Sequence, residues 1–182
     1  MTESTTIDRS AFVGTAMSLH TAGFKPEGSY LVEVLGAKPE VSSGTNQSTG
    51  ESFVSHKINF VLRAHKQADY AADGTGKGQY VGDSTLDPTL TFYKRINIAT
   101  KSLQFLRSAY KAVTGTLPTT SRPDYLAMAE ELRGAKFWIY NFWMQNEEGE
   151  WSEQIRNNVR SQQEGPLQSI VLRAEEVGGD ED

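Results

Sequence analysis

Hydrophobic and polar residues alternate along the first half of the chain in a way that predicts β-strands. Tyr30–Leu35 is a short apolar run ended by Gly36, and Phe53–Ala64 and Thr89–Ile98 are longer alternating segments. Successive side chains of a strand point to opposite faces, so each alternating segment has one apolar and one polar face. We expect three strands here, whose apolar faces hold Val54, His56, Ile58, Phe60 and Leu62 in the second strand and Leu90, Phe92, Ile96 and Ile98, with Lys94, in the third.

The apolar period then changes to that of helices. The pattern predicts one helix over Thr100–Val113, ended by Gly115. A second helix is expected over Ser121–Arg133, beginning with the capping box Ser121-x-x-Asp124 and ending at Gly134. Two more strands are expected after it, over Lys136–Gln145 and from Trp151 to about Arg160, joined by a hairpin turn.

The order of these elements is three strands, a helical insertion and a two-stranded hairpin. This order predicts a mainly β fold, a five-stranded antiparallel barrel of the oligonucleotide/oligosaccharide-binding (OB) type with helices between strands 3 and 4. We expect Lys38–Ser52 to be a polar loop and His65–Pro88 to be a long insertion, either functional or disordered. The expected domains are an arm over residues 1–22, the barrel over 23–172 and an acidic, disordered tail over 173–182.

The charges are unevenly distributed along the chain. The 182 residues include 18 Lys and Arg and 23 Asp and Glu, which gives a net charge of −5. The excess of acid lies in the tail, so the rest of the chain is close to neutral. Such a tail is either a solvated solubility feature or an interaction segment that binds basic partner surfaces or guards a basic groove. Its partner-binding residues are then Glu175, Glu176, Asp180, Glu181 and Asp182.

Several function classes find little support in the sequence. The chain has no cysteine, no apolar run long enough to span a bilayer and no secretory signal pattern at its N-terminus, so we expect a cytoplasmic protein. The segment Asp73–Gly78 lacks the glycine spacing and the Ser or Thr of a phosphate loop, and a flexible glycine loop explains it better. Glu130 and Glu131 are adjacent on a helix and cannot act as one dyad. We expect no catalytic site, no metal and no cofactor.

Basic and aromatic residues interleave on the polar faces of the predicted strands. Nucleic-acid single strands bind to surfaces that combine cations for the phosphates with flat rings on which bases stack. Exposed strands of any sheet also carry Lys and Arg, so the pattern has an ordinary structural explanation as well. The expected DNA-contacting set on these strands is Lys57, Arg63, Tyr93, Lys94, Arg95, Arg156 and Arg160.

The strand Lys136–Gln145 carries aromatic residues on both faces. One face must fill the core, and the other is either covered by helices and terminal segments or exposed as a stacking platform. The register leaves open which face is which. The uninterrupted set also includes Met144, and its aromatic members, taken as the candidate platform, are Trp138, Tyr140 and Phe142.

Several short motifs resemble a family of bacteriophage proteins that is catalogued as a domain of unknown function and associated with single-stranded DNA binding. The similar stretches are Pro26–Val34, Ile58–Leu62, the helix with Leu103 and Leu106, Glu131–Phe137, and the hairpin residues Gly149, Trp151, Ile155 and Asn158. The resemblance implies an OB-type barrel that coats single strands during phage replication or recombination, in the cytoplasm of the host. It also implies that the acidic tail recruits replication or recombination proteins. Many tails of single-strand-binding proteins end in a hydrophobic or aromatic residue. The tail of this chain differs from them because it ends in Asp180–Asp182.

The sequence thus predicts a non-enzymatic, sequence-tolerant protein that binds single-stranded DNA. The alternative is a protein-interaction module, such as an inhibitor, an adaptor or a virion component, that uses the same barrel and tail. Self-association into a homo-oligomer is compatible with both hypotheses.

Overall fold

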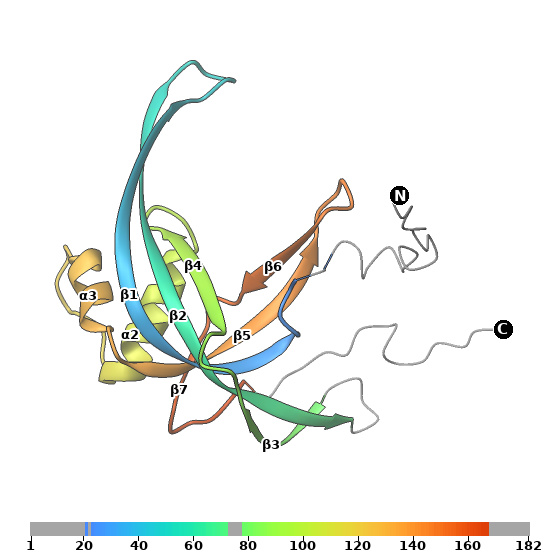
Figure 1. Cartoon of the computed structure of the whole chain (residues 1–182). Helices are drawn as coiled ribbons and strands as arrows, with labels where there is room; N and C mark the ends of the chain where they lie inside the picture. The colour runs from blue at the N-terminus through green and yellow to red at the C-terminus, as the bar shows by residue number, and fades with distance from the viewer. Residues whose placement is uncertain (1–20, 22, 73–77, 168–182) are drawn as a thin grey trace, which may run out of the picture.

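The computed structural model describes residues 21, 23–72 and 78–167 (Figure 1). The mainly β fold class is confirmed in this part of the chain, which contains seven strands and two helices. In chain order these are β1 (Gly28–Thr45), β2 (Ser52–Ala72), β3 (Gly78–Thr85), β4 (Thr91–Asn97), α2 (Leu103–Thr114), α3 (Tyr125–Glu131), β5 (Lys136–Gln145), β6 (Trp151–Ile155) and β7 (Arg160–Ser161). The predicted arm and tail fall outside these residues, except for Thr21 at the end of the arm.

The strands form one antiparallel sheet that curls into a half-barrel (Figure 1). Its order is β3-β2-β1-β5-β6, with β4 also paired to β2 and β7 to β5. The long strands β1 and β2 change partners along their length, since residues 28–33 of β1 pair with β5 whereas residues 36–45 pair with β2 alone. The register shift between Val34 and Gly36 leaves Leu35 as an extra residue and bends β1 between these parts. In the described sheet no ladder joins β4 to β6, so the barrel is open along this seam.

The concave side of the half-barrel holds the main core. Its largest fully buried side chains come from the sheet, from Leu132 after α3 and from α2, whose residues Phe105, Leu106 and Ala109 face the strands. The ring of Phe105 packs edge-on against Phe60 and Phe137, with centroids 5.5 and 6.1 Å away. Burial of apolar area contributes roughly 25 cal/mol per Å², so this packing of helix on sheet stabilises the fold.

Both predicted helices are present but their starts differ from the predictions. Helix α2 ends at Gly115, which has φ of +82° and donates its N–H to the Lys111 carbonyl, as expected for a terminating glycine. The predicted capping box at Ser121 is wrong. Asp124 is itself the N-cap of α3, because its side chain accepts the N–H of Ala127.

The predicted loop Lys38–Ser52 is instead mostly a β-hairpin. β1 continues to Thr45 and pairs with β2 from Ser52 onward, so only residues 46–51 form the turn. The ring of Phe53 lies across Gly44, where an added Cβ would sit 2.8 Å from the ring. Both faces of this hairpin contact water, and Val41, Val54 and His56 are exposed. The sequence analysis placed Val54 and His56 on the apolar face of this strand together with core residues, and for these two the prediction is wrong.

The predicted long loop His65–Pro88 is also a hairpin in large part. β2 extends to Ala72 and pairs with β3 from Lys66↔Thr85 to Ala72↔Gly78. Tyr70 and Tyr80 pack edge-on across the pair, with ring centroids 6.2 Å apart. Of the glycine segment Asp73–Gly78, only Gly78 belongs to the described residues.

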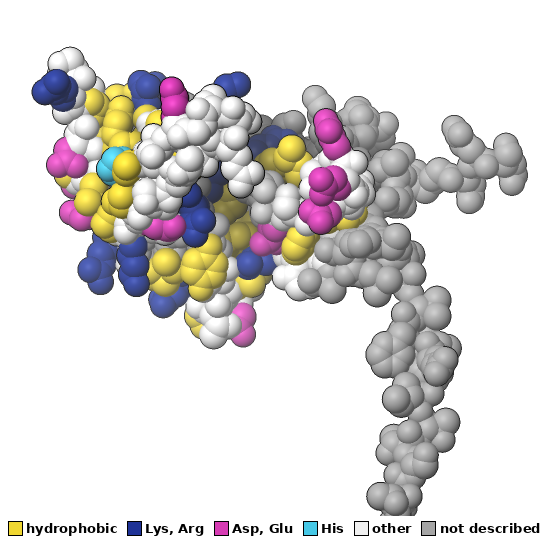
Figure 2. Space-filling model, turned by 90° about the horizontal axis from the view of Figure 1, so that it is seen from above, with side chains coloured by type: hydrophobic (Ala, Val, Ile, Leu, Met, Phe, Trp, Pro, Cys, Tyr) yellow, Lys and Arg dark blue, Asp and Glu magenta, His cyan; other side chains and the backbone are white. Residues whose placement is uncertain are grey.

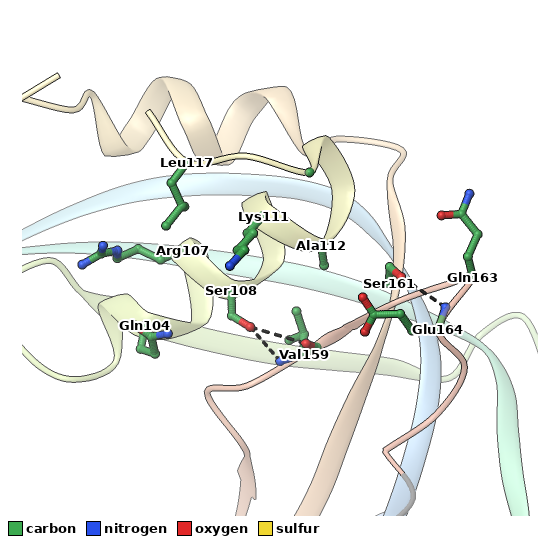
Figure 3. Close-up of a pocket in the computed structure, with 11 residues that line it drawn as sticks. Gln104, Arg107, Ser108, Lys111, Ala112, Leu117, Val159, Ser161, Gln163 and Glu164 are labelled. Carbon is green, nitrogen blue, oxygen red and sulfur yellow. Dashed lines mark hydrogen bonds between the residues drawn. The ribbon is translucent and has the colours of Figure 1, made fainter. Parts of the chain in front are cut away.

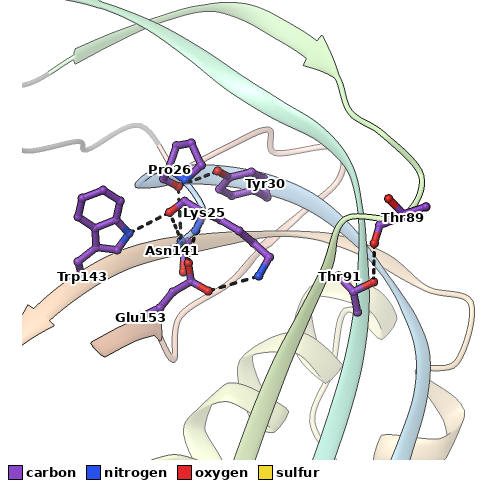
Figure 4. Close-up of polar contacts among 8 residues, drawn as sticks. All are labelled: Lys25, Pro26, Tyr30, Thr89, Thr91, Asn141, Trp143 and Glu153. Carbon is purple, nitrogen blue, oxygen red and sulfur yellow. Dashed lines mark hydrogen bonds and ion pairs between the residues drawn. The ribbon is translucent and has the colours of Figure 1, made fainter. Parts of the chain in front are cut away.

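A polar network ties the segment before β1 to β5 and β6 (Figure 4). The Lys25 carbonyl accepts hydrogen bonds from Trp143 Nε1 at 2.9 Å and Asn141 Nδ2 at 3.2 Å. The Lys25 ammonium lies 3.4 Å from Glu153. Tyr30 donates its hydroxyl to the Pro26 carbonyl, and burial, together with the Glu153 carboxylate, raises the pKa of Tyr30. These contacts fix the entry of β1 beside the open seam.

The predicted last strand, from Trp151 to Arg160, is interrupted. β6 ends at Ile155, and β7 is a separate two-residue strand that pairs with β5. The inward positions are confirmed, since Ile155 and Val159 are buried.

Candidate nucleic-acid interface

The register between β2 and β4 places most of the predicted strand cations on one surface. Lys57 lies opposite Asn97, Asn59 opposite Arg95, Val61 opposite Tyr93 and Arg63 opposite Thr91. Residues directly opposite each other share a face of the sheet. We define the cationic face as the outer surface formed by Lys57, Arg63, Tyr93 and Arg95.

The alternation predicted for β4 is confirmed. Phe92 and Ile96 are buried in the main core, whereas Tyr93 is 75% exposed and the Arg95 side chain 60% exposed. The ring of Tyr93 is therefore exposed to solvent, at a position of the sheet between Arg63 and Arg95. In the view of Figure 2, Lys and Arg side chains gather beside exposed hydrophobic ones along the lower left of the surface.

Arg95 is held in place by two neighbours on the cationic face. Its Nε donates to Asn59 Oδ1 at 3.0 Å, and its guanidinium lies 3.4 Å from the Glu40 carboxylate. The Asn59 amide also donates to Glu40, at 2.7 Å. This hydrogen bond, with the nearby charges of Arg95 and Lys57, holds the pKa of Glu40 below its ordinary value. Glu40 is thus ionised at neutral pH, orients Arg95 and offsets part of the positive charge.

A groove runs along the open seam between β4 and β6. Two adjoining pockets, of about 190 and about 550 Å³, share Lys94, Arg95 and Gln154 in their walls. Tyr93 lines the first pocket, and Phe142 and Arg156 line the second. Because Arg95 borders both pockets, the groove is continuous with the cationic face.

Arg156 occupies the β6 side of this groove. Its guanidinium lies 4.3 Å from the centroid of the Tyr140 ring and 5.9 Å from that of Phe142. The residue is exposed, so its N–H donors remain accessible from solvent. An Arg stacked on aromatic rings loses less conformational freedom when it binds a phosphate.

Lys94 lies on the inward face of β4, as its strand parity predicts, and does not join the outer surface of the expected DNA-contacting set. Its side chain points inward, and its ammonium donates to the Ile155 carbonyl at 2.8 Å and to Asn157 Oδ1 at 3.0 Å. The ammonium also lies 5.5 Å from the centroid of the Phe105 ring. Burial lowers the pKa of Lys94. Lys94 therefore bridges β4 and β6 where no ladder joins them, and its charge is directed at the seam and not at the outer surface.

The rings of Trp138 and Tyr140 are only 3% exposed each, so they do not form an open platform. Trp138 packs with Leu31, Ala68 and the partly buried Tyr70 in a small second cluster on the convex side of the sheet. The predicted alternative, in which this face of β5 is covered, is the one that the structure supports. Phe142 is half-buried and remains at the groove.

Arg160 lies apart from the groove. It sits on β7 opposite Trp138, and its side chain bonds to the carbonyl and carboxylate of Glu164 at 3.1 and 3.5 Å. The acidic residues predicted to bind partners, from Glu175 onward, lie outside the described residues.

Sequence reasoning missed several residues of this surface. Asn59 and Glu40 form the support of Arg95, and Gln154 lines both pockets. Asn59 lies on the same face of its strand as Lys57 and Arg63, so strand alternation could have placed it on this surface. Glu40 could not be placed in this way, because its segment was expected to be a loop.

Other kinds of site find no counterpart in the described part of the chain. There, His, Asp and Glu side chains form no group of three suited to a metal ion. Neither described helix has the length and apolar composition needed to cross a membrane. Comparisons of the sequence with protein-family models and with curated proteins find no match.

Proposed function

We propose that this protein binds single-stranded DNA without sequence preference, as a non-enzymatic coat protein built on an OB-type barrel. The pairing of β1 with both β2 and β5, of β4 with β2 and of β6 with β5 supports the OB plan, with β3 and β7 as additions. The motifs shared with the phage family favour a role in phage replication or recombination in the host cytoplasm.

The observation that carries the proposal is the exposed Tyr93 ring set among Lys57, Arg63 and Arg95, with Arg156 across the groove. The cations follow the phosphates and release condensed counterions, which supplies affinity that does not depend on sequence. The ring offers a stacking surface to any base. A strand bound in this way lies along the groove between β4 and β6 and crosses onto the outer face of β2.

Salt dependence of oligo-dT binding tests this mechanism. Each phosphate neutralised on a single strand contributes about −0.7 to the slope of log affinity against log salt. Lys57→Gln and Arg63→Gln should each weaken binding and make the slope less steep by about 0.7. Arg122→Gln is the matched control, because this exposed arginine lies in the loop before α3. Binding that does not change with salt, or equal effects of all three variants, would rule out the cationic mechanism.

A second candidate function is protein interaction through the outer part of the β1–β2 hairpin. Val41 and Val54 are 64% and 61% exposed and lie on the same face, since Val41 pairs with His56 and Ser43 with Val54. Pull-downs with and without single-stranded DNA separate the two functions. If protein interaction is the function, Val41→Ser with Val54→Ser abolishes capture of a partner, and the wild type shows no affinity for oligo-dT.

A further inference from the structure

A second open pocket lies on α2, away from the cationic face. It has a volume of about 570 Å³ and is bounded by α2, the turn after it and the segment around β7 (Figure 3). None of the residues that line it belongs to the groove between β4 and β6. We call it the α2 pocket.

The α2 pocket combines positive charge with an apolar floor. Arg107 and Lys111 are exposed and stand one helical turn apart, so they share a side of α2. Glu164 is the one carboxylate among the described lining residues, and its side chain already pairs with Arg160. Leu117 and Ala112, both partly buried, with the buried Val159, supply the apolar part. This combination fits a peptide that carries both carboxylates and aliphatic side chains.

The chain itself supplies such a peptide next to the pocket. The last described residue, Leu167, is fixed where its carbonyl accepts the Tyr70 hydroxyl and its N–H donates to Ser29 Oγ at 3.2 Å. Leu167 follows Glu164, which lines the pocket, by three residues, and therefore lies at most about 11 Å from it along an extended chain.

The sequence after Leu167 matches the pocket in chemistry and in reach. Ile170, Val171 and Leu172 form an apolar run, and five carboxylates follow from Glu175 to Asp182. Eight extended residues from Leu167 to Glu175 span up to about 26–29 Å. This length allows the apolar run to extend to the apolar part of the pocket and the first carboxylates to extend to the cations.

We propose that residues 168–182 dock in the α2 pocket of their own chain, with the Ile170–Leu172 run toward Leu117 and carboxylates on Arg107 and Lys111. The tether gives the tail an effective concentration in the millimolar range, so a contact with a dissociation constant near 1 mM is occupied about half of the time. Such a contact is weak enough for a basic partner surface to displace. The inference concerns the tail alone and does not depend on DNA binding.

Disulfide trapping in the full chain tests the docking. The chain has no cysteine, so two introduced cysteines report a single contact. Gln104→Cys in the pocket wall is combined with Val177→Cys in the tail. The control pair replaces Gln104→Cys by Gln79→Cys, because Gln79 is exposed and pairs with Ala71, beside the Tyr70 that bonds Leu167. An undirected tail would meet Gln79 at least as readily as Gln104.

Docking predicts that the Gln104 pair forms an intramolecular disulfide about tenfold faster than the Gln79 pair. Adding Arg107→Glu with Lys111→Glu, or raising the salt concentration, should remove most of this advantage. Unchanged urea midpoints show that each variant is folded. Equal rates for the two pairs, an advantage that survives the charge reversal, or cross-links only between molecules would overturn the proposal.

Discussion

At the residue scale, the strongest expectation concerns Tyr93. It is 75% exposed, so its ring contributes little to the core, whereas base stacking on such a ring is worth about 1–3 kcal/mol. Tyr93→Ala should weaken oligo-dT binding by roughly 5- to 150-fold, and Tyr93→Phe should retain most of the affinity. Fluorescence anisotropy measures both variants, with urea unfolding as the control for stability. A Tyr93→Ala protein that binds like the wild type would remove the stacking role.

Tyr70 predicts how stability depends on alkaline pH. Burial raises the pKa of Tyr70 to about 12, from about 10 in an unfolded chain. The folded state therefore holds the proton more tightly, and this contribution to stability is complete below pH 10 and lost as the pH rises toward 12. The free energy of unfolding should fall over this window.

Tyr70→Phe cannot ionise and should show a shallower fall between pH 10 and pH 12. It loses the hydrogen bond to the Leu167 carbonyl, so at neutral pH it should be less stable by about 1 kcal/mol. Urea titrations at a series of pH values measure both effects, with the exposed Tyr93→Phe as control. If the curves for Tyr70→Phe and the wild type run parallel, the assignment is contradicted, because the fall would then come from other tyrosines whose pKa is raised, such as the buried Tyr30.

At the scale of elements, we expect Lys94 and Arg95, which are neighbours in β4, to have different roles. Lys94 should contribute mainly to stability, and Arg95 mainly to DNA binding. Lys94 bridges to β6 through two hydrogen bonds, whereas Arg95 points to solvent. Lys94→Met should lower the free energy of unfolding by about 1–3 kcal/mol, because the Ile155 carbonyl and Asn157 lose a charged donor. Arg95→Met should change stability by less than about 1 kcal/mol but weaken oligo-dT binding. Urea unfolding measures the stability of both variants, and fluorescence anisotropy measures their affinity for oligo-dT. If Arg95→Met lost stability and Lys94→Met lost only binding, the inner and outer faces of β4 would be misassigned.

The elements that sequence could predict are those that bury one face. The alternation of β4 and the apolar stripe of α2 are both local patterns, and the structure has both elements at nearly the expected bounds. The outer part of β1 and the far end of β2 lacked such a pattern. Both stretches pair as hairpins. The outer part of β1 has solvent on both faces, and the far end of β2 buries one face only through the small Ala68 and the partly buried Tyr70, so neither stretch shows the apolar alternation of a half-buried strand.

The candidate site was predictable only in part for the same reason. Strand parity was enough to place Tyr93 and Arg95 outward. It could not reveal that Trp138 is covered, because the cover comes from Leu31 and from Ala68 and Tyr70 in the part of β2 that was expected to be a loop. The inward bridge of Lys94 depends in turn on the open seam, which is a property of the whole sheet.

At the scale of the whole molecule, the acidic tail should slow the encounter with DNA. The net charge of the chain is −5, and deletion of residues 173–182, which removes five carboxylates and Arg173, changes it to −1. Deletion of residues 173–182 should therefore raise the association rate with oligo-dT several-fold at about 0.01 M salt, where the Debye length is about 30 Å. The difference should disappear near 1 M, where that length is about 3 Å.

A full-length variant with Gln or Asn at the five positions separates the effect of charge from that of chain length, and stopped-flow fluorescence measures the association rates. If charge is the cause, the neutral tail behaves like the deletion; if it behaves like the wild type, the tail acts by occupying space, and long-range repulsion is excluded.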